Sequence, residues 1–342
     1  MTIFTKMSRV IAVLALGLFA MIAQPQASQA QDIINPTAES VTEDALMEAL
    51  NGDAQVQGRV SIPDDLSSGL IKPANRGWAD THGGPVRTVN LIAVVGMIVL
   101  LVAFYAIRGK IRIDSGPSSE RIQRFSATER FAHWLMAVSF IVLALTGLNL
   151  VFGRAVILPV FGEDAFGTLS AWGKIAHNYM GFAFMLGLIL SFVYWIAHNI
   201  PDKVDMHWLS KGGGLFVKGV HPPAKKFNAG QKGIFWSVTL GGATLSFTGV
   251  MLLFPELAGG EAGWQLYQVI HGVVAAILTA IVIAHIYIGS VGMEGAYDAM
   301  GSGEVDLNWA KEHHSLWVEE VQGKSSDGTG DGSARPGTQP AE

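Results

Sequence analysis

Four histidines lie within or at the ends of long apolar segments of this sequence, and their spacing favours metal ligation: His133, His177, His271 and His285. An ionisable or ligating side chain at membrane depth is costly, so its default interpretation is functional. His271 and His285 lie fourteen residues apart on one segment. On an α-helix this spacing gives about 21 Å of rise and returns to nearly the same face. One helix can therefore offer ligands at two depths, which predicts two stacked, bis-histidine b-type haems in a membrane bundle.

The composition agrees with a redox protein of the membrane that holds its cofactor through histidine. Half of the 342 residues are hydrophobic and only 15% are charged, a balance typical of a chain with several spanning helices. The chain has no cysteine, which excludes disulfides, covalent c-type haem and thiolate-bound iron–sulfur clusters. The sequence also contains no H-E-x-x-H motif, so a catalytic zinc site is not expected. No basic cluster interleaved with aromatics indicates nucleic-acid binding.

Apolar runs predict five spanning helices, at about 88–107, 132–153, 173–198, 233–254 and 267–291. Lys and Arg crowd the first and third connections between these spans, whereas the second has two and the fourth none. Because basic residues accumulate on the cytoplasmic side, the first and third connections are predicted to be cytoplasmic. The expected location is the bacterial inner membrane, with the mature N-terminus in the periplasm and the C-terminus in the cytoplasm.

The segments outside the central spans have distinct compositions. Residues 1–30 resemble a cleavable signal peptide, with a positive start, a short apolar core and small residues before a cut site. Residues 31–87 form an acidic segment that the topology places in the periplasm, and 321–342 are predicted to be disordered. The span at 88–107 contains one clearly polar residue, Asn90, for which we expect no role in binding haem or an ion.

The predicted topology pairs the four histidines by depth. His177 and His271 fall toward the periplasmic side, and His133 and His285 toward the cytoplasmic side. Nearby glycines either admit a flat macrocycle or let helices pack closely: Gly181, Gly272 and Gly289. Surface or interface roles are expected for five histidines at a helix end or in polar segments: His198, His207, His221, His313 and His314.

Several short strings then point to one family. They are RFAHW at 130–134, NIPDK at 199–203, NAGQK at 228–232, HIY at 285–287 and WAKEHH at 309–314. In their order and spacing they resemble the cytochrome b (gamma) subunit of respiratory membrane-bound formate dehydrogenase, over about residues 120–320. The N-terminal segments and the extra span have no counterpart in the compact form of that family.

The resemblance implies an all-α membrane protein: a four-helix transmembrane bundle at 120–320 that binds two haem b groups, preceded by one extra transmembrane helix. It implies His177 and His271 as ligands of the periplasmic haem, with His133 and His285 on the cytoplasmic haem. It also implies a quinone pocket near the cytoplasmic haem, built from Asn228, Gly230 and Gln231 with His285 close by. For residues 228–231 the alternative is an ordinary turn and helix cap.

The expected function is a membrane-anchoring dihaem subunit of formate dehydrogenase. It would receive electrons from a periplasmic iron–sulfur subunit and pass them through two b haems to membrane quinone. Formate oxidation would take place on a molybdenum or tungsten subunit, because this chain has no thiols to hold such centres. Two alternatives remain open: the cytochrome b subunit of a membrane hydrogenase or another molybdenum oxidoreductase, and a haem-free, histidine-lined proton or metal transporter.

Overall fold

A computed structural model describes residues 81–328 of the chain. The predicted signal peptide, almost all of the acidic segment at 31–87 and the end of the predicted tail therefore lie outside the described residues.

Five of the described helices are long and apolar enough to cross a membrane. This confirms the prediction of an all-α membrane protein with one helix before a four-helix bundle. The five are α4 (Arg87–Arg108), α5 (Ala127–Val156), α6 (Leu158–Trp195), α8 (Ala229–Leu253) and α9 (Glu261–Tyr287).

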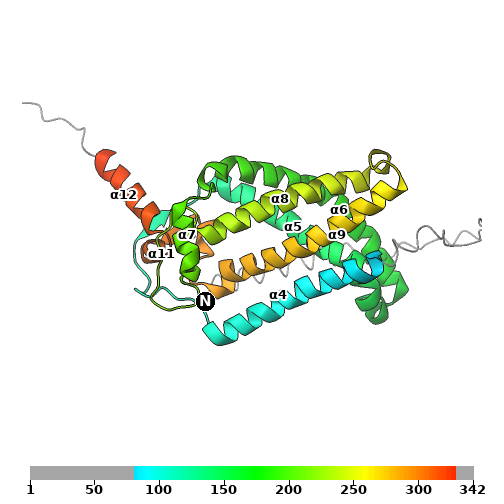
Figure 1. The fold of residues 1–342 in the computed structure, drawn as a ribbon, viewed down its shortest axis with the longest axis horizontal. Coiled ribbons are helices and arrows are strands. Elements are labelled where there is room, and N and C mark those ends of the chain that lie inside the picture. The colour runs from blue at the N-terminus through cyan, green and yellow to red at the C-terminus, as the bar shows by residue number, and fades with distance from the viewer. Residues whose placement is uncertain (1–80, 329–342) are drawn as a thin grey trace, which may run out of the picture. The chain divides into compact units, whose positions relative to one another are not determined.

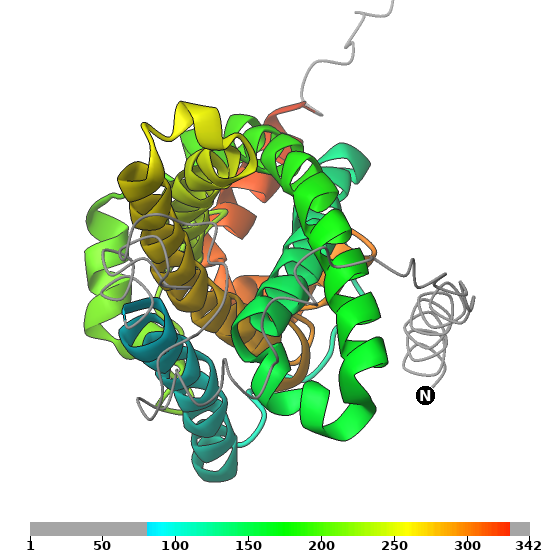
Figure 2. The ribbon, with the colours of Figure 1, turned by 90° about the vertical axis from the view of Figure 1, so that its right-hand side faces the viewer.

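The bundle is formed by α5, α6, α8 and α9, in which α5 packs on α6, α6 on α8 and α8 on α9. Figure 2 looks along the bundle and shows these four helices around a common axis. The extra helix α4 lies outside the bundle and packs along α9, as the cyan and orange ribbons in Figure 1 show.

The spanning helices begin earlier than the apolar runs predict, and at α5 and α8 polar side chains cap the start. Ser126 accepts from the backbone N–H of Glu129 at the start of α5, and the Glu129 carboxylate accepts from the backbone N–H of Ser126. Asn228 and Gln231 form the same reciprocal arrangement at the start of α8. Such capping boxes pair N–H groups that the first turn leaves unpaired, so a helix can start in polar sequence that hydropathy does not read as a span.

Shorter elements cover the end of the bundle where α5 and α8 begin and α9 ends (Figure 1). Strands β1 and β2 pair antiparallel, with Ile122 opposite Val305. The remaining elements are η2 (His82–Val86), β1 (Arg121–Gln123), η3 (Ile196–His198), α7 (Lys203–Ser210), η4 (Gly212–Gly214), η5 (Pro255–Leu257), η6 (Ile288–Gly292), α10 (Asp298–Gly301), β2 (Glu304–Asp306), α11 (Leu307–His313) and α12 (Ser315–Gly328).

Two boundaries differ from the sequence-based expectation. The helical conformation before α4 already begins in η2, so the extra span starts within the segment 31–87 that was assigned to the periplasm. At the other end, α12 continues through Gly328, whereas disorder was predicted from residue 321. The start of α12 is held by Trp317, which is buried in the cluster of Phe125, Val305 and Trp309.

Candidate functional site

The four histidines of the membrane segments meet as two facing pairs. Pair I consists of His177 on α6 and His271 on α9, whose ring centroids are 6.3 Å apart at an interplanar angle of 57°. Pair II consists of His133 on α5 and His285 on α9, with centroids 6.2 Å apart at 61°. The structure thus brings together the same residues that the depth argument paired.

The ring separations suit an iron atom between each pair. A metal–imidazole bond is about 2 Å long, so two such bonds plus the radii of two rings give a centroid separation of about 6 Å. The observed values of 6.2 and 6.3 Å match this span, and they are too long for a direct hydrogen bond between the rings. The residues therefore fit two bis-histidine haems, although their role as axial ligands stays a prediction.

In pair I a threonine fixes the protonation of His177. Thr146 on α5 has its hydroxyl oxygen 2.8 Å from Nδ1 of His177 and 2.7 Å from the carbonyl oxygen of Val142. A hydroxyl has a single proton, and the carbonyl can only accept. The hydroxyl therefore donates to Val142 and accepts the proton of Nδ1. This leaves the lone pair on Nε2 of His177, the nitrogen available to bind iron.

The second histidine of pair I, His271, also has a threonine partner, and that threonine lies on α8. The Thr248 hydroxyl on α8 lies 2.8 Å from Nδ1 of His271 and donates to the carbonyl of Thr244, also at 2.8 Å. Hydrogen bonds of this kind commonly orient metal-bound imidazoles and raise their basicity. Sequence reasoning missed both threonines, because hydroxyl residues in spanning helices usually bond only to their own backbone.

Each of these threonines is followed by a glycine that lies beside the imidazole of its histidine. A Cβ at Gly147 would lie 3.6 Å from Cε1 of His177, and one at Gly249 would lie 3.6 Å from Cε1 of His271. A side chain at either position would thus add atoms beside the ring of its histidine. The Thr-Gly dipeptide at 146–147 and again at 248–249 is the sequence signal that could have revealed these positions.

Pair II has a different surrounding. Nδ1 of His133 is buried and has no hydrogen-bond partner among the described residues. The ring of Trp134 stands edge-on to His133 at 5.2 Å, and its indole N–H donates to the carbonyl of Met300 at 2.9 Å. Aromatic packing therefore surrounds His133, without the hydroxyl acceptor that characterises pair I.

A cluster of buried apolar side chains separates the two levels of histidines. Leu278 is 2% exposed and lies midway between His271 and His285 on α9. It packs in one cluster with Phe140, Phe184 and Leu188 from α5 and α6. These side chains fill the centre of the bundle with hydrocarbon, which excludes water between the pairs.

The residues predicted to bind quinone form a helix cap. Oδ1 of Asn228 accepts from the Gln231 N–H at 2.9 Å, and Oε1 of Gln231 accepts from the Asn228 N–H at 3.1 Å. A Cβ at Gly230 would lie 3.1 Å from the ring of Trp208, so glycine permits that close contact. The cap interpretation is confirmed. The cap uses the side-chain oxygens of Asn228 and Gln231 but not their amide NH₂ groups. These NH₂ groups can therefore donate to another molecule.

Of the three glycines near the proposed ligands, Gly272 serves helix packing. A Cβ there would lie 2.9 Å from Cγ1 of Val86, at the start of the extra helix. The helix-packing interpretation therefore holds at this position. A Cβ at Gly181 or Gly289 would meet no atom within 4 Å.

His314, for which a surface or interface role was expected, lies instead in the interior. This residue is fully buried, its Nδ1 lies 2.8 Å from the Lys225 carbonyl, and its Nε2 lies 3.1 Å from Nη2 of Arg124. Burial and the nearby guanidinium hold the pKa of His314 well below its usual value, so the ring is neutral. Burial likewise lowers the pKa of Arg124 to about 9, while Glu129 opposes this shift. These side chains help to build the core of the elements that cover the bundle end.

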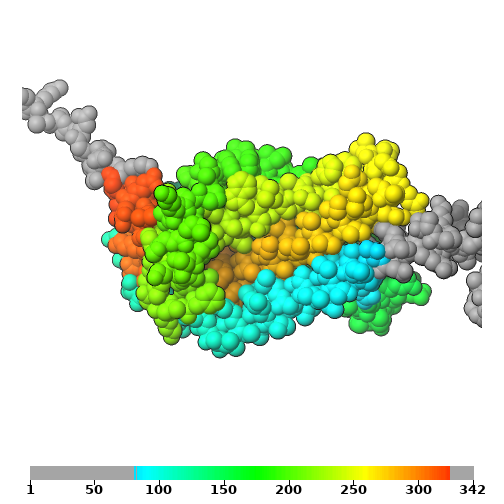
Figure 3. Space-filling model, in the orientation of Figure 1, coloured from blue at the N-terminus to red at the C-terminus, as the bar shows by residue number. Residues whose placement is uncertain are grey.

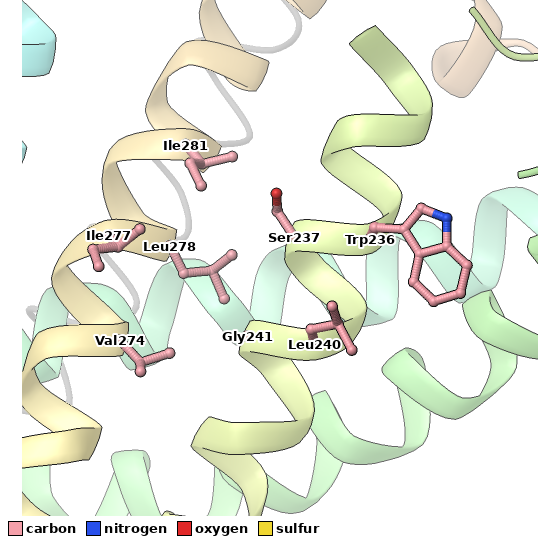
Figure 4. Close-up of a pocket in the computed structure, with 8 residues that line it drawn as sticks. All are labelled: Trp236, Ser237, Leu240, Gly241, Val274, Ile277, Leu278 and Ile281. Carbon is pink, nitrogen blue, oxygen red and sulfur yellow. The ribbon is translucent and has the colours of Figure 1, made fainter. Parts of the chain in front are cut away.

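An apolar groove of about 310 Å³ runs between α8 and α9 (Figure 4). It has no charged residue in its lining and suits hydrocarbon chains. The lining residues are Trp236, Ser237, Leu240, Gly241, Val274, Ile277, Leu278 and Ile281.

Residues 124–303 match the family model for prokaryotic cytochrome b561. This range includes all four histidines and both threonines of the pairs, and it excludes α4. Among curated proteins, the chain is 32% identical to the cytochrome b556(Fdn) subunit of nitrate-inducible formate dehydrogenase from Escherichia coli K12, over 60% of this chain and 93% of that protein. It is 29% identical to the formate dehydrogenase cytochrome b556 subunit of Haemophilus influenzae, over 58% and 83% of the two chains.

The matched range covers more than half of the chain and agrees with the histidine pairs inside a bundle of spanning helices. A cytochrome b of this kind implies haem b as the cofactor, which favours a redox role over a haem-free transporter. The chain is a multi-pass membrane protein that belongs to the prokaryotic cytochrome b561 family.

Proposed function

We propose that this chain is the membrane cytochrome b subunit of a formate dehydrogenase and that it holds two b haems. The single observation that carries the proposal is the pair of facing imidazole sets, 6.3 and 6.2 Å apart, at two levels of one bundle. The relatives from Escherichia coli and Haemophilus influenzae support formate dehydrogenase as the complex, since both are cytochrome b556 subunits of that enzyme. They favour it over the hydrogenase alternative.

In this proposal each side chain has a defined task. His177 and His271 bind the periplasmic haem through Nε2, while Thr146 and Thr248 hold Nδ1 protonated and orient the rings. His133 and His285 bind the cytoplasmic haem. Each haem, when bound, supplies a site that accepts and releases one electron.

The cytoplasmic end is the proposed site of quinone reduction. Asn228 and Gln231 lie in the first turn of α8, at the bundle end where α9 approaches its last turn with His285 (Figure 1). Their amide NH₂ groups, which the cap does not use, are suitable donors to a quinone carbonyl, and Gly230 lets the ring of Trp208 pack against the same turn. Reduction of one quinone to quinol takes up two electrons and two protons, and the cytoplasm would supply the protons.

The partners follow from what this chain lacks. Formate oxidation and the relay of electrons to this subunit need a molybdenum or tungsten centre and iron–sulfur clusters. A chain without cysteine cannot hold thiolate-bound clusters. We therefore place a catalytic subunit and an iron–sulfur subunit on the periplasmic side, in contact with the end of the bundle that holds pair I. The excess of Lys and Arg in the first and third connections supports this orientation in the inner membrane.

Single histidine variants of the complete purified complex test the proposal. His177→Ala and His133→Ala should each lose one of two b haems, measured as haem per protein and by reduced-minus-oxidised spectra. His207→Ala is the matched control, because this histidine is exposed on α7 and should leave both haems in place. A complex whose His177→Ala variant retains two haems and full formate-to-quinone turnover would refute the assignment. Co-purification with a nickel–iron enzyme would instead identify a hydrogenase.

A further inference from the structure

The extra helix α4 lies outside the residues that match the family, yet its first turn makes polar contact with the bundle beside pair I. Most of α4 presents apolar side chains to the surroundings: Leu91 is 52% exposed and Ile92 66%. Asn90 is the exception, since it is polar and only 4% exposed. Figure 3 shows the length of α4 against α9, with its outer face uncovered.

The buried amide of Asn90 is bound to α9 next to a proposed haem ligand. Its Nδ2 donates to the carbonyl of Gly272 at 3.1 Å and to the carbonyl of Val86 at 2.9 Å. Gly272 directly follows His271 in the chain. A buried amide that lost these partners would pay a desolvation penalty. The bond to Val86 lies within the same helical turn, so it is the bond to Gly272 that favours one placement of α4 against α9.

The same contact depends on the absence of a side chain at Gly272. Val86 is 3% exposed, and a Cβ added to Gly272 would come within 2.9 Å of its Cγ1. Such a distance is too short for two carbon atoms, so the side chain of Val86 or the turn that carries it would have to shift away from α9. Steric fit and hydrogen bonding therefore both fix how closely α4 approaches α9 at Gly272, one residue from His271.

The first turn of α4 also touches a second helix of the bundle, α5. The Arg87 guanidinium lies 5.7 Å from the ring centroid of Phe152 on α5. A cation over an aromatic face is attracted to it, and the attraction is larger where water is scarce. This turn of α4 thus joins α9 and α5, the helices that carry His271 and Thr146.

We propose that Val86, Arg87 and Asn90 form a positioning element for pair I, which sets the placement of α9 at His271 relative to His177. The proposal rests on the assignment of pair I as haem ligands. Asn90 binds no cofactor itself, which agrees with the expectation from sequence, but it acts on the cofactor site through the backbone of Gly272. The extra helix is then a functional addition to the family bundle, because it stiffens the site where electrons enter.

Three variants of the complete complex test this role. Asn90→Leu keeps the size of the side chain and removes both hydrogen bonds. Gly272→Ala leaves Asn90 in place and displaces α4 through Val86. The double variant Val86→Ala/Gly272→Ala restores the space. Leu91→Ala, on the exposed face of the same helix, is the control.

We expect Asn90→Leu and Gly272→Ala to shift the low-field electron paramagnetic resonance signal and the midpoint potential of one haem only. The same haem should be lost about tenfold faster to a scavenger, the lower end of the range for groups that orient metal ligands. The double variant should recover the parental spectrum, and Leu91→Ala should retain it. A general loss of folding would alter both haems and would not be rescued in this way.

The outcomes separate this proposal from the haem assignment. If His271→Ala loses one haem while Asn90→Leu and Gly272→Ala leave both spectra and potentials unchanged, the positioning role is wrong and the ligand assignment stands. If His271→Ala retains both haems, the assignment of pair I fails and this proposal fails with it. Altered signals from both haems, without rescue by Val86→Ala, would also overturn the positioning role.

Discussion

Replacing Thr248 by valine removes one hydroxyl beside pair I and leaves the shape of the side chain nearly unchanged. In the parent protein this hydroxyl accepts the Nδ1 proton of His271 at 2.8 Å and donates to its own helix at Thr244. Valine can do neither. The carbonyl of Thr244 keeps its helical partner, whereas Nδ1 of His271 loses its acceptor in a membrane interior. The main cost of the substitution therefore falls on the imidazole.

The magnitude follows from that lost acceptor. A neutral hydrogen bond contributes about 1 kcal/mol net, and a buried donor left unpaired costs about 1–3 kcal/mol. Since about 1.4 kcal/mol corresponds to a factor of ten, haem should be lost from this site about 10- to 100-fold faster. The hydrogen bond also makes the imidazole a stronger donor to ferric iron, so its removal should raise the midpoint potential of the same haem.

The assay compares Thr248→Val with Thr244→Val in the purified complex. Thr244 lies one turn away on α8, is partly exposed, and donates to the Leu240 carbonyl at 2.9 Å. Both variants lose a hydroxyl from the same helix, but only one loses a partner of histidine. Haem transfer to an excess of a scavenging protein and a potentiometric titration give the two readouts. Equal haem retention and equal potentials in the two variants would refute the reasoning.

Three further predictions concern the quinone cap and the end of the bundle. Asn228→Asp keeps the oxygen that caps α8 but loses the NH₂ donor, so stability should hold while quinone reduction loses about tenfold in kcat/KM, as expected for one hydrogen bond; unchanged kinetics would exclude this donor. Lys232→Met removes the partner of Asp205, whose carboxylate lies 2.7 Å away in a buried ion pair, and should lower the free energy of unfolding in detergent by about 3–5 kcal/mol. Burial lowers the pKa of His313 to about 4 and depresses that of His314. Because the unfolded chain binds these protons below about pH 6.5 and the folded chain does not, stability should fall as the pH drops from 6.5 toward 4; the variant His313→Asn/His314→Gln should flatten this profile, and an equally steep profile would contradict the assignment.

The sequence was sufficient for the part of the site that obeys helix periodicity. The spacing of His271 and His285 on one apolar segment implied histidines at two depths of the membrane. The charge of the connections implied which of the other two histidines lies at the depth of each. Helix spacing concerns a single helix, and the distribution of charge concerns the whole membrane. Neither depends on which side chains of different helices touch one another. The structure pairs the same rings.

The partners of these histidines could not be predicted in the same way. Thr146 reaches His177 from another helix, and Asn90 reaches Gly272 from a helix distant in sequence. Such contacts depend on the rotation of one helix against another, which neither hydropathy nor spacing determines. From the sequence Asn90 is a lone polar residue in an apolar span, whereas in the structure its amide donates once to its own helical turn at Val86 and once across the interface to Gly272.

The unequal surroundings of the two pairs bear on the direction of electron transfer. Both imidazoles of pair I donate through Nδ1 to a threonine hydroxyl, whereas His133 of pair II has no such acceptor among the described residues. A hydrogen-bonded imidazole stabilises ferric iron more strongly, so the haem at pair I should have the lower midpoint potential. Electrons that enter there would then move downhill toward pair II and the quinone.

A potentiometric titration of the complex, with the two haems identified through His177→Ala and His133→Ala, measures this order directly. The double variant Thr146→Val/Thr248→Val should raise the midpoint potential of the haem at pair I and so narrow the gap between the two midpoint potentials. It removes the hydroxyl acceptors that only pair I has and leaves the surroundings of pair II unchanged. If the haem at pair I has the higher potential, or if the gap is unchanged in the double variant, the threonines do not set the direction. The gradient would then have to come from charge or solvent exposure around the haems rather than from the hydrogen bonds to their ligands.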